Sequence, residues 1–284
     1  MNIFRTSNGV VVEDGGRYVT VPLSALSWDA IFRAADPRAV VAAAVETASG
    51  TPQTGTYDPR AVLPPTEHQE VWASGVTYYR SRDARMEEAQ AAGGGDFYAK
   101  VYEAERPELF FKSTAERVVG HGAPVRLRRD SRWNVPEPEL VLAVNSHGRI
   151  FGYSVGNDMS SRDIEGENPL YLPQAKVYDG SCAIGPGLAL PPTPPGPETA
   201  INLEIVRDGR PAFAGETTLA QLKRSPEVLA AYLYREMSFP NGALLFTGTG
   251  IVPPNEFTLQ VGDEIRIGIT GVGMLVNVVA PLGR

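Results

Sequence analysis

The order of hydrophobic and polar positions along the chain favours β-strands for most of its length. From residue 71 onward, short apolar runs are separated by glycine and proline residues, which is typical of strand-rich folds. Stretches with a helical pattern interrupt this order at 80–92, 96–108 and 225–237. We therefore predict a mixed α+β fold in which strands dominate.

The first residues of the chain have a pattern of their own. Strands are predicted at 9–14 and 17–22 and a helix at 36–48, and a turn-rich tract follows over 55–70. We expect a small N-terminal α+β domain at 1–66 and a larger domain at 67–284.

A predicted β-hairpin begins with two glutamates placed one residue apart. The run 140–144 is predicted to be a strand, 145–148 a turn and 149–156 the antiparallel partner. Because side chains alternate along a strand, the pairing decides their faces. We expect Glu139 to lie opposite Ser154, Glu137 opposite Gly156 and Val144 opposite Arg149. This register groups the bulky side chains on one face, which we expect to be core: Leu140, Leu142, Val144, Phe151, Tyr153 and Val155.

The opposite face of this hairpin collects carboxylates from Glu137, Glu139 and, just past the partner strand, Asp158. The residues opposite the glutamates are small, so the three side chains can meet at one point. Unpaired, they would repel one another and at least one would hold a proton, whereas a divalent cation removes the repulsion. Oxygen-only ligands favour Mg²⁺, Mn²⁺ or Ca²⁺ over Zn²⁺. The alternative is an exposed acidic strand end without a metal.

Composition argues against several kinds of partner. The formal net charge is −7 with a pI near 5.1, and no basic stripe typical of nucleic-acid binding is present. No run approaches the roughly 20 apolar residues of a membrane span, and the N-terminus lacks the apolar core of a signal peptide. The single cysteine, Cys182, leaves no internal disulfide framework. We expect a cytoplasmic protein that acts on a small molecule.

Several motifs resemble the fumarylacetoacetate hydrolase family and occur in that family's order. They lie between residues 71 and 279 and are "PEPELVLAV", "GYSVGNDMSSRD", "PLYLPQAKVYDGSCAIGP", "LLFTGTGIVP" and "VGDEIRIGITGVGMLVNVV". The resemblance implies a β-sandwich roll or distorted barrel for a catalytic domain at 67–284, and a homodimer or homotetramer. It also implies that Glu137, Glu139 and Asp158 hold Mg²⁺, with Mn²⁺ or Ca²⁺ as alternatives.

The resemblance implies a reaction as well. Within the family, segments 106–122 and 167–178 are most similar to dehydratases of 2-keto-3-deoxy pentonates. Hydrolases and decarboxylases of the family generally carry a histidine after the "GxxY" turn, but this chain has none between His68 and His121. We expect Mg²⁺-dependent loss of water from a 2-oxo acid through a metal-stabilised enolate. A C–C hydrolase or decarboxylase of a dioxo acid, and a binding protein without turnover, are the alternatives.

The candidate catalytic residues are Lys176 in "LPQAKVY" and Glu108 in "RPELFFKS", which can exchange protons with the substrate. Lys112 is expected to pair with Glu108. The candidate substrate-binding residues are Ser74, Gly75, Tyr78, Arg82, Thr247 and Thr249. On the residues alone, Lys176 can equally be a surface lysine, Arg82 an ordinary helix ion-pair partner, and the turn "FTGTGIVP" only a turn.

Overall fold

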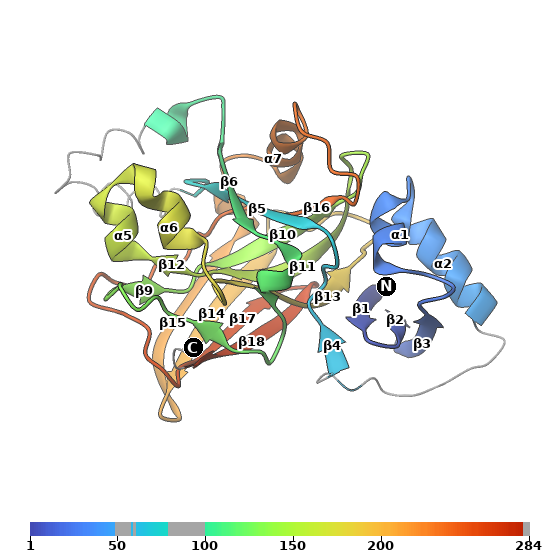
Figure 1. Cartoon of the computed structure of the whole chain (residues 1–284), viewed down its shortest axis with the longest axis horizontal. Helices are drawn as coiled ribbons and strands as arrows, with labels where there is room; N and C mark the ends of the chain where they lie inside the picture. Colours follow the sequence, from blue (N-terminus) through green and yellow to red (C-terminus); the bar gives the residue numbers. More distant parts are fainter. Residues whose placement is uncertain (49–57, 59–60, 79–99, 281–284) are drawn as a thin grey trace.

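The computed structural model describes residues 1–48, 58, 61–78 and 100–280, which form two packed β-sheets flanked by short helices (Figure 1). The prediction of a strand-dominated α+β fold is confirmed. The helix expected at 80–92, and Arg82 within it, lie outside the described residues. The helix expected at 96–108 is helical at 100–103 and gives way to a strand at Glu108.

The larger sheet contains eleven of the described strands. Its order is β3-β2-β1-β13-β11-β10-β16-β5-β6, with β4 paired to β1 and β7 paired to β13. In chain order these strands are β1 Asn2–Thr6, β2 Gly9–Asp14, β3 Arg17–Pro22, β4 Val62–Leu63, β5 Glu70–Gly75, β6 Glu108–Ser113, β7 Val118–Val119, β10 Pro138–Val144, β11 Ile150–Asp158, β13 Cys182–Ala189 and β16 Ala243–Phe246.

The second sheet has the order β15-β14-β17-β18-β8, and β12 pairs with β9 as a separate short ribbon. The strands are β8 Val125–Arg126, β9 Asn134–Val135, β12 Ser160–Ser161, β14 Ala200–Arg207, β15 Arg210–Thr218, β17 Glu264–Ile269 and β18 Gly273–Ala280. Within the described residues no strand pairs across the two main sheets, so the sheets stay open. The distorted-barrel description is therefore corrected to two open sheets packed face to face.

Short helices cover the rims and one end of the larger sheet (Figure 1). They are α1 Trp28–Arg33, α2 Pro37–Ala48, α5 Arg162–Glu167, α6 Leu172–Lys176 and α7 Pro226–Leu233, with single 3₁₀ turns at η3 Ala115–Arg117, η4 Pro169–Tyr171 and η5 Leu219–Gln221. Ser27 precedes α1 and Ser225 precedes α7, and the hydroxyl of each accepts a backbone N–H that the first helical turn leaves unpaired.

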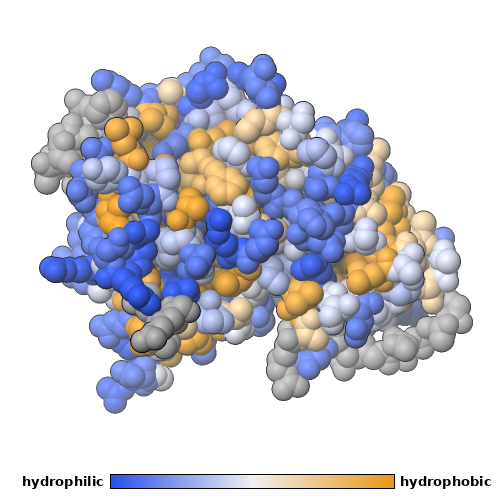
Figure 2. Space-filling view, viewed as in Figure 1, coloured by the Kyte–Doolittle hydropathy of each residue, from blue (hydrophilic) through white to orange (hydrophobic). Residues whose placement is uncertain are grey.

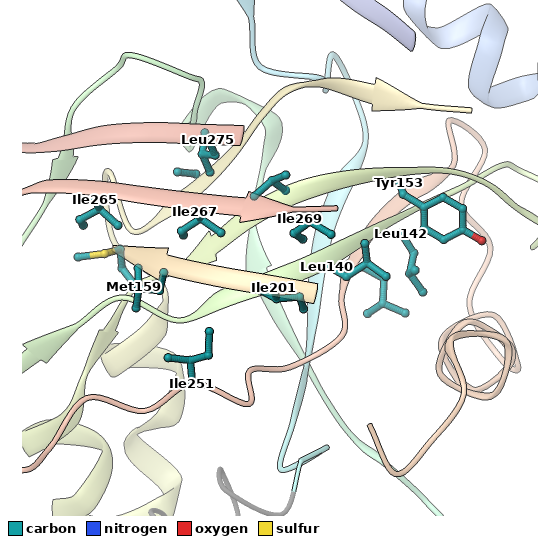
Figure 3. Packing of buried hydrophobic residues seen from close by; sticks show 14 of the residues in the cluster. Leu140, Leu142, Tyr153, Met159, Ile201, Ile251, Ile265, Ile267, Ile269 and Leu275 are labelled. Carbon is teal, nitrogen blue, oxygen red and sulfur yellow. The ribbon is translucent and has the colours of Figure 1, made fainter. Parts of the chain in front are cut away.

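The main hydrophobic core lies between the two sheets (Figure 3). In β17 every second residue is buried, and Ile265, Ile267 and Ile269 point at the larger sheet. Leu140 and Leu142 of β10 meet them from the other side. Each fully buried aliphatic side chain of this kind contributes about 1.5–3 kcal/mol relative to exposure. The core therefore fixes the hairpin that carries the acidic residues.

The opposite face of β10 is also buried. Val141 and Ala143 belong to a second cluster that includes Trp28 and Phe32 of α1. In the same sheet β1 pairs with β13, with Asn2 opposite Ala189. The N-terminal strands thus extend the sheet of the main body and share its second core. The division at residues 66 and 67 stays a prediction.

The predicted hairpin register is wrong by two residues. Glu139 lies opposite Gly156 instead of Ser154. The turn closes one residue later than expected, because Asn145 N donates to Arg149 O, and a bulge at Ala143–Val144 adds the second residue. An even shift keeps each side chain before the bulge on its predicted face, so Leu140, Leu142, Tyr153 and Val155 share the main core as expected.

The prediction that Phe151 lies on that core face is wrong. Phe151 lies beyond the bulge and packs against the second cluster, with its ring edge-on to Phe32 at 4.9 Å between centroids. A bulge reverses the alternation of the residues next to it.

The surface mixes polar and apolar side chains. On the face shown in Figure 2, hydrophilic residues surround separate hydrophobic patches. Among the described helices, none has the length and apolar character needed to cross a membrane.

Candidate active site

The carboxylates of Glu137, Glu139 and Asp158 meet where β10 begins and β11 ends. All three side chains are buried, and one ligand oxygen from each lies within 4.8 Å of the others. The backbone creates this arrangement, because Asp158 N donates to Glu137 O at 3.0 Å while Glu139 lies opposite Gly156. The predicted convergence of the three acids is confirmed, and the alternative of an exposed acidic strand end is wrong.

Gly156, opposite Glu139, lies in a closely packed part of the sheet next to the carboxylates. A Cβ at this position would lie 2.3 Å from the Phe246 ring and 2.5 Å from a methyl group of Val141. No side chain fits there without moving its neighbours. The small residue opposite Glu139 is therefore required by packing.

Three cationic side chains surround the carboxylates. Lys176 Nζ, at the end of α6, donates to Glu137 Oε2 at 2.7 Å and to Asp158 Oδ2 at 3.1 Å. Arg162 Nη2, at the start of α5, donates to Glu137 Oε1 at 2.9 Å. Lys112 Nζ, on β6, lies 2.5 Å from Asp158 Oδ1. All three cations are buried beside the acids.

These cations correct two expectations. Lys112 pairs with Asp158 and not with Glu108, which lies about 13 Å away along the extended strand. Part of the repulsion among the carboxylates is also offset without a metal ion, because cations pair with Glu137 and Asp158. The case for a metal must therefore rest on the donor set and on access for a substrate.

Glu139 has a distinct electrostatic environment. Burial raises its pKa well above the ordinary value, and the charges of Asp158 and Glu137 raise it further, while Lys176 and a backbone N–H act in the opposite direction. That N–H belongs to Gly248 and donates to Glu139 Oε2 at 2.5 Å. Gly248 has φ +93°, and a Cβ there would lie 1.9 Å from Thr77 Oγ1, so glycine is needed to present the N–H.

The donor set suits a hard divalent cation. It consists of carboxylate oxygens that are buried and close together, which is the chemistry that Mg²⁺, Mn²⁺ and Ca²⁺ prefer. Cys182 lies opposite Asp158 in the sheet, but burial raises the pKa of its thiol to about 12. A protonated thiol is a poor ligand, so a soft metal gains no sulfur donor here.

A small pocket opens above the carboxylates. Its lining residues are Ser74, Gly75, Val76, Phe110, Glu137, Glu139, Asp158, Arg162, Lys176, Gly248 and Thr249. The predicted residues Ser74, Gly75, Lys176 and Thr249 thus lie around the acids. The Ser74 hydroxyl donates to Glu108 O at 3.1 Å, and the Thr249 hydroxyl donates to Ile251 O at 3.2 Å.

The remaining predicted residues take three different positions. Glu108 pairs with Gly75 across β5 and β6, and its carboxylate lies where a Cβ of Gly75 would be, 2.1 Å from that point. Thr247 and Tyr78 are buried behind the lining, where the Thr247 hydroxyl donates to Leu140 O at 3.0 Å. Burial and the charge of Glu139 raise the pKa of the Tyr78 hydroxyl. Arg82 lies outside the described residues.

A second group of potential ligands lies at the N-terminal side of the molecule. Asp29, Glu67 and His68 also bring ligand atoms within 4.8 Å of one another. His68 Nδ1 lies 2.7 Å from Asp29 Oδ2, and the His68 side chain is 62% exposed. Asp29 Oδ1 accepts from Gln69 Nε2 at 2.8 Å, and Arg33 lies 3.5 Å from Asp29 Oδ2. Neighbouring side chains of the protein therefore already pair with Asp29.

Sequence comparison identifies the family. The profile of the family described as fumarylacetoacetate (FAA) hydrolase, C-terminal, matches residues 70–280. The chain therefore belongs to the fumarylacetoacetate hydrolase family, which confirms the resemblance stated from its motifs.

Two named relatives and one solved structure are similar to this chain over most of its length. The chain is 47% identical over 214 residues to the probable 2-keto-3-deoxyxylonate dehydratase of Haloferax volcanii, covering 75% of this chain and 73% of that protein. It is 43% identical over 218 residues to the 2-dehydro-3-deoxy-D-arabinonate dehydratase of Saccharolobus solfataricus, covering 76% and 73%. A solved 2-keto-3-deoxy-D-arabinonate dehydratase, complexed with magnesium and 2,5-dioxopentanoate, superposes with a TM-score of 0.79 at 32% identity over the full length of both chains.

Three groups that shape this site were not among the predicted catalytic, metal-binding and substrate-binding residues. Lys112 and Arg162 come from β6 and α5, and the Gly248 N–H comes from the turn after β16. The neighbourhood of Lys112 carried a usable signal, because a lysine that follows "ELFF" in a strand is placed to enter the core. For the backbone N–H of Gly248 the signal was the glycine-rich turn "FTGTGIVP", which is suited to donate backbone N–H groups to an anion; here the anion is the Glu139 carboxylate.

Proposed function

We propose that this protein is a Mg²⁺-dependent dehydratase of a 2-keto-3-deoxy sugar acid, such as a 3-deoxy-pentonate. One observation carries the proposal: three buried carboxylates line a pocket that also contains a buried lysine, with Glu108 at its edge. The dehydratase relatives, and the magnesium and 2,5-dioxopentanoate held by one of them, support this assignment.

In this proposal Glu137, Glu139 and Asp158 hold the metal ion. A bound divalent cation supplies a Lewis acid for the carboxylate and keto oxygens of a 2-oxo acid. Mn²⁺ and Ca²⁺ prefer the same oxygen donors. The Gly248 N–H fixes the orientation of the Glu139 carboxylate, and Arg162 does the same for Glu137. Ligands held in this way lose little freedom when the ion binds.

Two side chains divide the proton transfers of the elimination. The Lys176 ammonium is paired with two carboxylates and lines the pocket, so we assign it as the proton donor to the departing C4 hydroxyl. The Glu108 carboxylate, placed against Gly75, is then the acceptor of the C3 proton. The two groups come from different elements, α6 and β6, which allows them to act on neighbouring carbons.

The substrate contacts follow from the pocket lining. Ser74, Gly75 and Thr249 are proposed to touch the substrate, since they line the pocket. Tyr78 and Thr247 lie behind that lining and are proposed to hold its shape. A contact from Arg82 stays a prediction from the sequence.

One assay tests the proposal. The purified protein is incubated with Mg²⁺ and a 2-keto-3-deoxy-pentonate, and the product mass is measured. A product lighter by one water supports the dehydratase. Cleavage into two smaller acids supports a C–C hydrolase instead, although the stretch between His68 and His121 lacks the histidine expected of one. Binding without turnover supports a binding protein.

Two further expectations belong to the same proposal. A homodimer or homotetramer is expected from the family, and light scattering of the purified protein measures it. A cytoplasmic location is expected because the chain has one cysteine, which is free and buried. Fractionation of the source cells tests that location.

A further inference from the structure

We propose that Lys112 is a fixed positive charge that couples the divalent cation to the 2-oxo acid: it weakens binding of the cation alone and strengthens binding of the acid to the cation-loaded site. This inference rests on the metal site of the proposed function, but not on dehydration. Lys112 does not belong to the pocket lining described above, so it acts through charge and through the groups that it holds.

The surroundings of the Lys112 side chain suit a positive charge. Lys112 Nζ is 0% exposed and has three oxygen partners: Asp158 Oδ1 at 2.5 Å, Lys176 O at 2.6 Å and Met159 O at 3.1 Å. An ammonium group has three donors and no acceptor, whereas a neutral amine has only two donors. Two carbonyl acceptors and a carboxylate ion-pair partner around one nitrogen suit the ammonium form.

The two buried lysines are held differently. Two of the three partners of Lys112 Nζ are backbone carbonyl oxygens, which cannot follow a ligand into the pocket. Lys176 Nζ donates to Glu137 and Asp158, and its side chain lines the pocket. Lys176 is thus able to turn from the carboxylates to a substrate, while Lys112 keeps its charge in place.

The charge balance of the site predicts that the divalent cation and the 2-oxo acid each strengthen the binding of the other. When all three carboxylates are ionised, the positive charges of Lys112, Lys176 and Arg162 equal their negative charges in number. A divalent cation bound alone leaves this buried site with an excess of two positive charges, which low-dielectric surroundings make unfavourable. A 2-oxo acid anion reduces that excess. Each ligand therefore raises the affinity for the other by the same factor, and couplings of this kind are typically about 5- to 150-fold.

The test measures binding without turnover. Calorimetry gives the Kd of Mg²⁺ with and without saturating pyruvate, the smallest 2-oxo acid, for the wild-type protein and for Lys112→Met and Lys112→Gln. The matched control, Arg266→Met, removes one positive charge on β17 from ion pairs with Glu264 on the same strand and Glu204 on β14. Circular dichroism and thermal melting establish that each variant is folded.

The expected signs separate a charge effect from a structural one. Pyruvate lowers the wild-type Kd of Mg²⁺ at least about fivefold. Both Lys112 variants bind Mg²⁺ alone about tenfold more tightly, because a unit charge a few ångströms away no longer opposes the cation. The same variants bind pyruvate more weakly in the presence of Mg²⁺. Arg266→Met matches the wild type in both measurements.

Three results would overturn the inference. A wild-type Kd for Mg²⁺ that does not respond to pyruvate removes the coupling, and this result needs no variant. Weaker Mg²⁺ binding in folded Lys112 variants means that Lys112 only holds Asp158 in place. Absence of Mg²⁺ binding in the wild type removes both this inference and the metal site. In contrast, coupled binding without loss of water from a 2-keto-3-deoxy acid contradicts the proposed function alone.

Discussion

Two groups of side chains in this protein meet the same geometric condition and differ in almost everything else. Glu137, Glu139 and Asp158 bring their ligand atoms as close together as the N-terminal group of Asp29, Glu67 and His68 does. The first group, the hairpin group, is fully buried at the open end of the β10–β11 hairpin, between two cores. In the second, only Asp29 is buried, and His68 is largely open to solvent.

The difference shows why proximity of ligand atoms does not by itself define a metal centre. Around the N-terminal group the cationic partner Arg33 is 57% exposed, and ion pairs of this kind contribute about 0–1 kcal/mol. In the hairpin group, burial raises the pKa of Glu139, cations pair with Glu137 and Asp158, and the acids line a small pocket. Desolvation, together with a place in the lining of a pocket, distinguishes the hairpin group from the N-terminal group.

Removing one carboxylate from each group gives the largest expected contrast. Glu139→Gln is expected to lower turnover of a 2-keto-3-deoxy acid by about 10³-fold or more, because a lost ligand removes several kcal/mol of transition-state stabilisation. It also removes Mg²⁺ binding measured by calorimetry. Glu67→Gln is the matched control and leaves both quantities unchanged. Turnover retained in Glu139→Gln, or lost in Glu67→Gln, would reverse the assignment of the two groups.

Removing one cation from each group comes next in size. Lys176→Met is expected to lower kcat by about 10²- to 10⁴-fold, since it removes the proposed proton donor. Mg²⁺ binding persists in this variant, because the three carboxylates remain. Arg33→Met removes the cation beside Asp29 and keeps the wild-type kcat. Steady-state kinetics with calorimetry measures both, and an unchanged kcat in Lys176→Met would contradict the role of Lys176.

The sequence predicted the hairpin group well, because its members lie close together along the chain. Alternation places Glu137 and Glu139 on one face, and Asp158 follows on the partner strand. The register is shifted by an even number of residues, so the error in the pairing partners did not change which side chains share a face. A turn closed by Asn145 and a bulge at Val144 depend on side-chain hydrogen bonds and on packing, which hydrophobic periodicity does not contain.

The cations of the site show where sequence reasoning ends. Lys112, Arg162 and Lys176 come from β6, α5 and α6, and only the fold brings them to the carboxylates. Lys112 was predicted to pair with Glu108 because the two are close in sequence, but an extended strand separates them. The open shape of the two sheets has the same origin, since it depends on which strands remain at the edges.

A smaller effect is expected from a change in the packing around Gly156, next to the carboxylates. Gly156→Ala is expected to lower the free energy of unfolding by about 1–3 kcal/mol, because the added methyl group would overlap Phe246 and Val141. Gly152→Ala on the same strand is the milder control, since its nearest neighbour would be Ala189 O at 3.2 Å. Urea denaturation measures both variants. Equal unfolding free energies for the two variants would mean that the surroundings of Gly156 are not tightly packed.

The smallest expected effect is on the pH dependence of the metal-free protein. The pKa of Glu139 is raised in the folded state above the ordinary value of 4.5, so the folded state binds its proton more tightly than the unfolded state does. The stability that this proton provides is fully present below the ordinary carboxyl pKa and is lost as the pH rises through the raised one. The slope for a single proton is at most about 1.4 kcal/mol per pH unit.

A divalent cation binds the ionised carboxylate, so the stabilisation that Mg²⁺ provides is expected to grow over the same pH range. Thermal melting at a series of pH values from 4 upward, with and without Mg²⁺, measures both trends. Glu139→Gln is expected to flatten them, because its amide does not titrate, whereas Glu67→Gln keeps the wild-type slope. A Mg²⁺-induced shift in Tm that is independent of pH in the wild type would show that burial of Glu139 does not govern cation binding. The hairpin group would then differ from the N-terminal group in access to a substrate, but not in the electrostatics of its carboxylates.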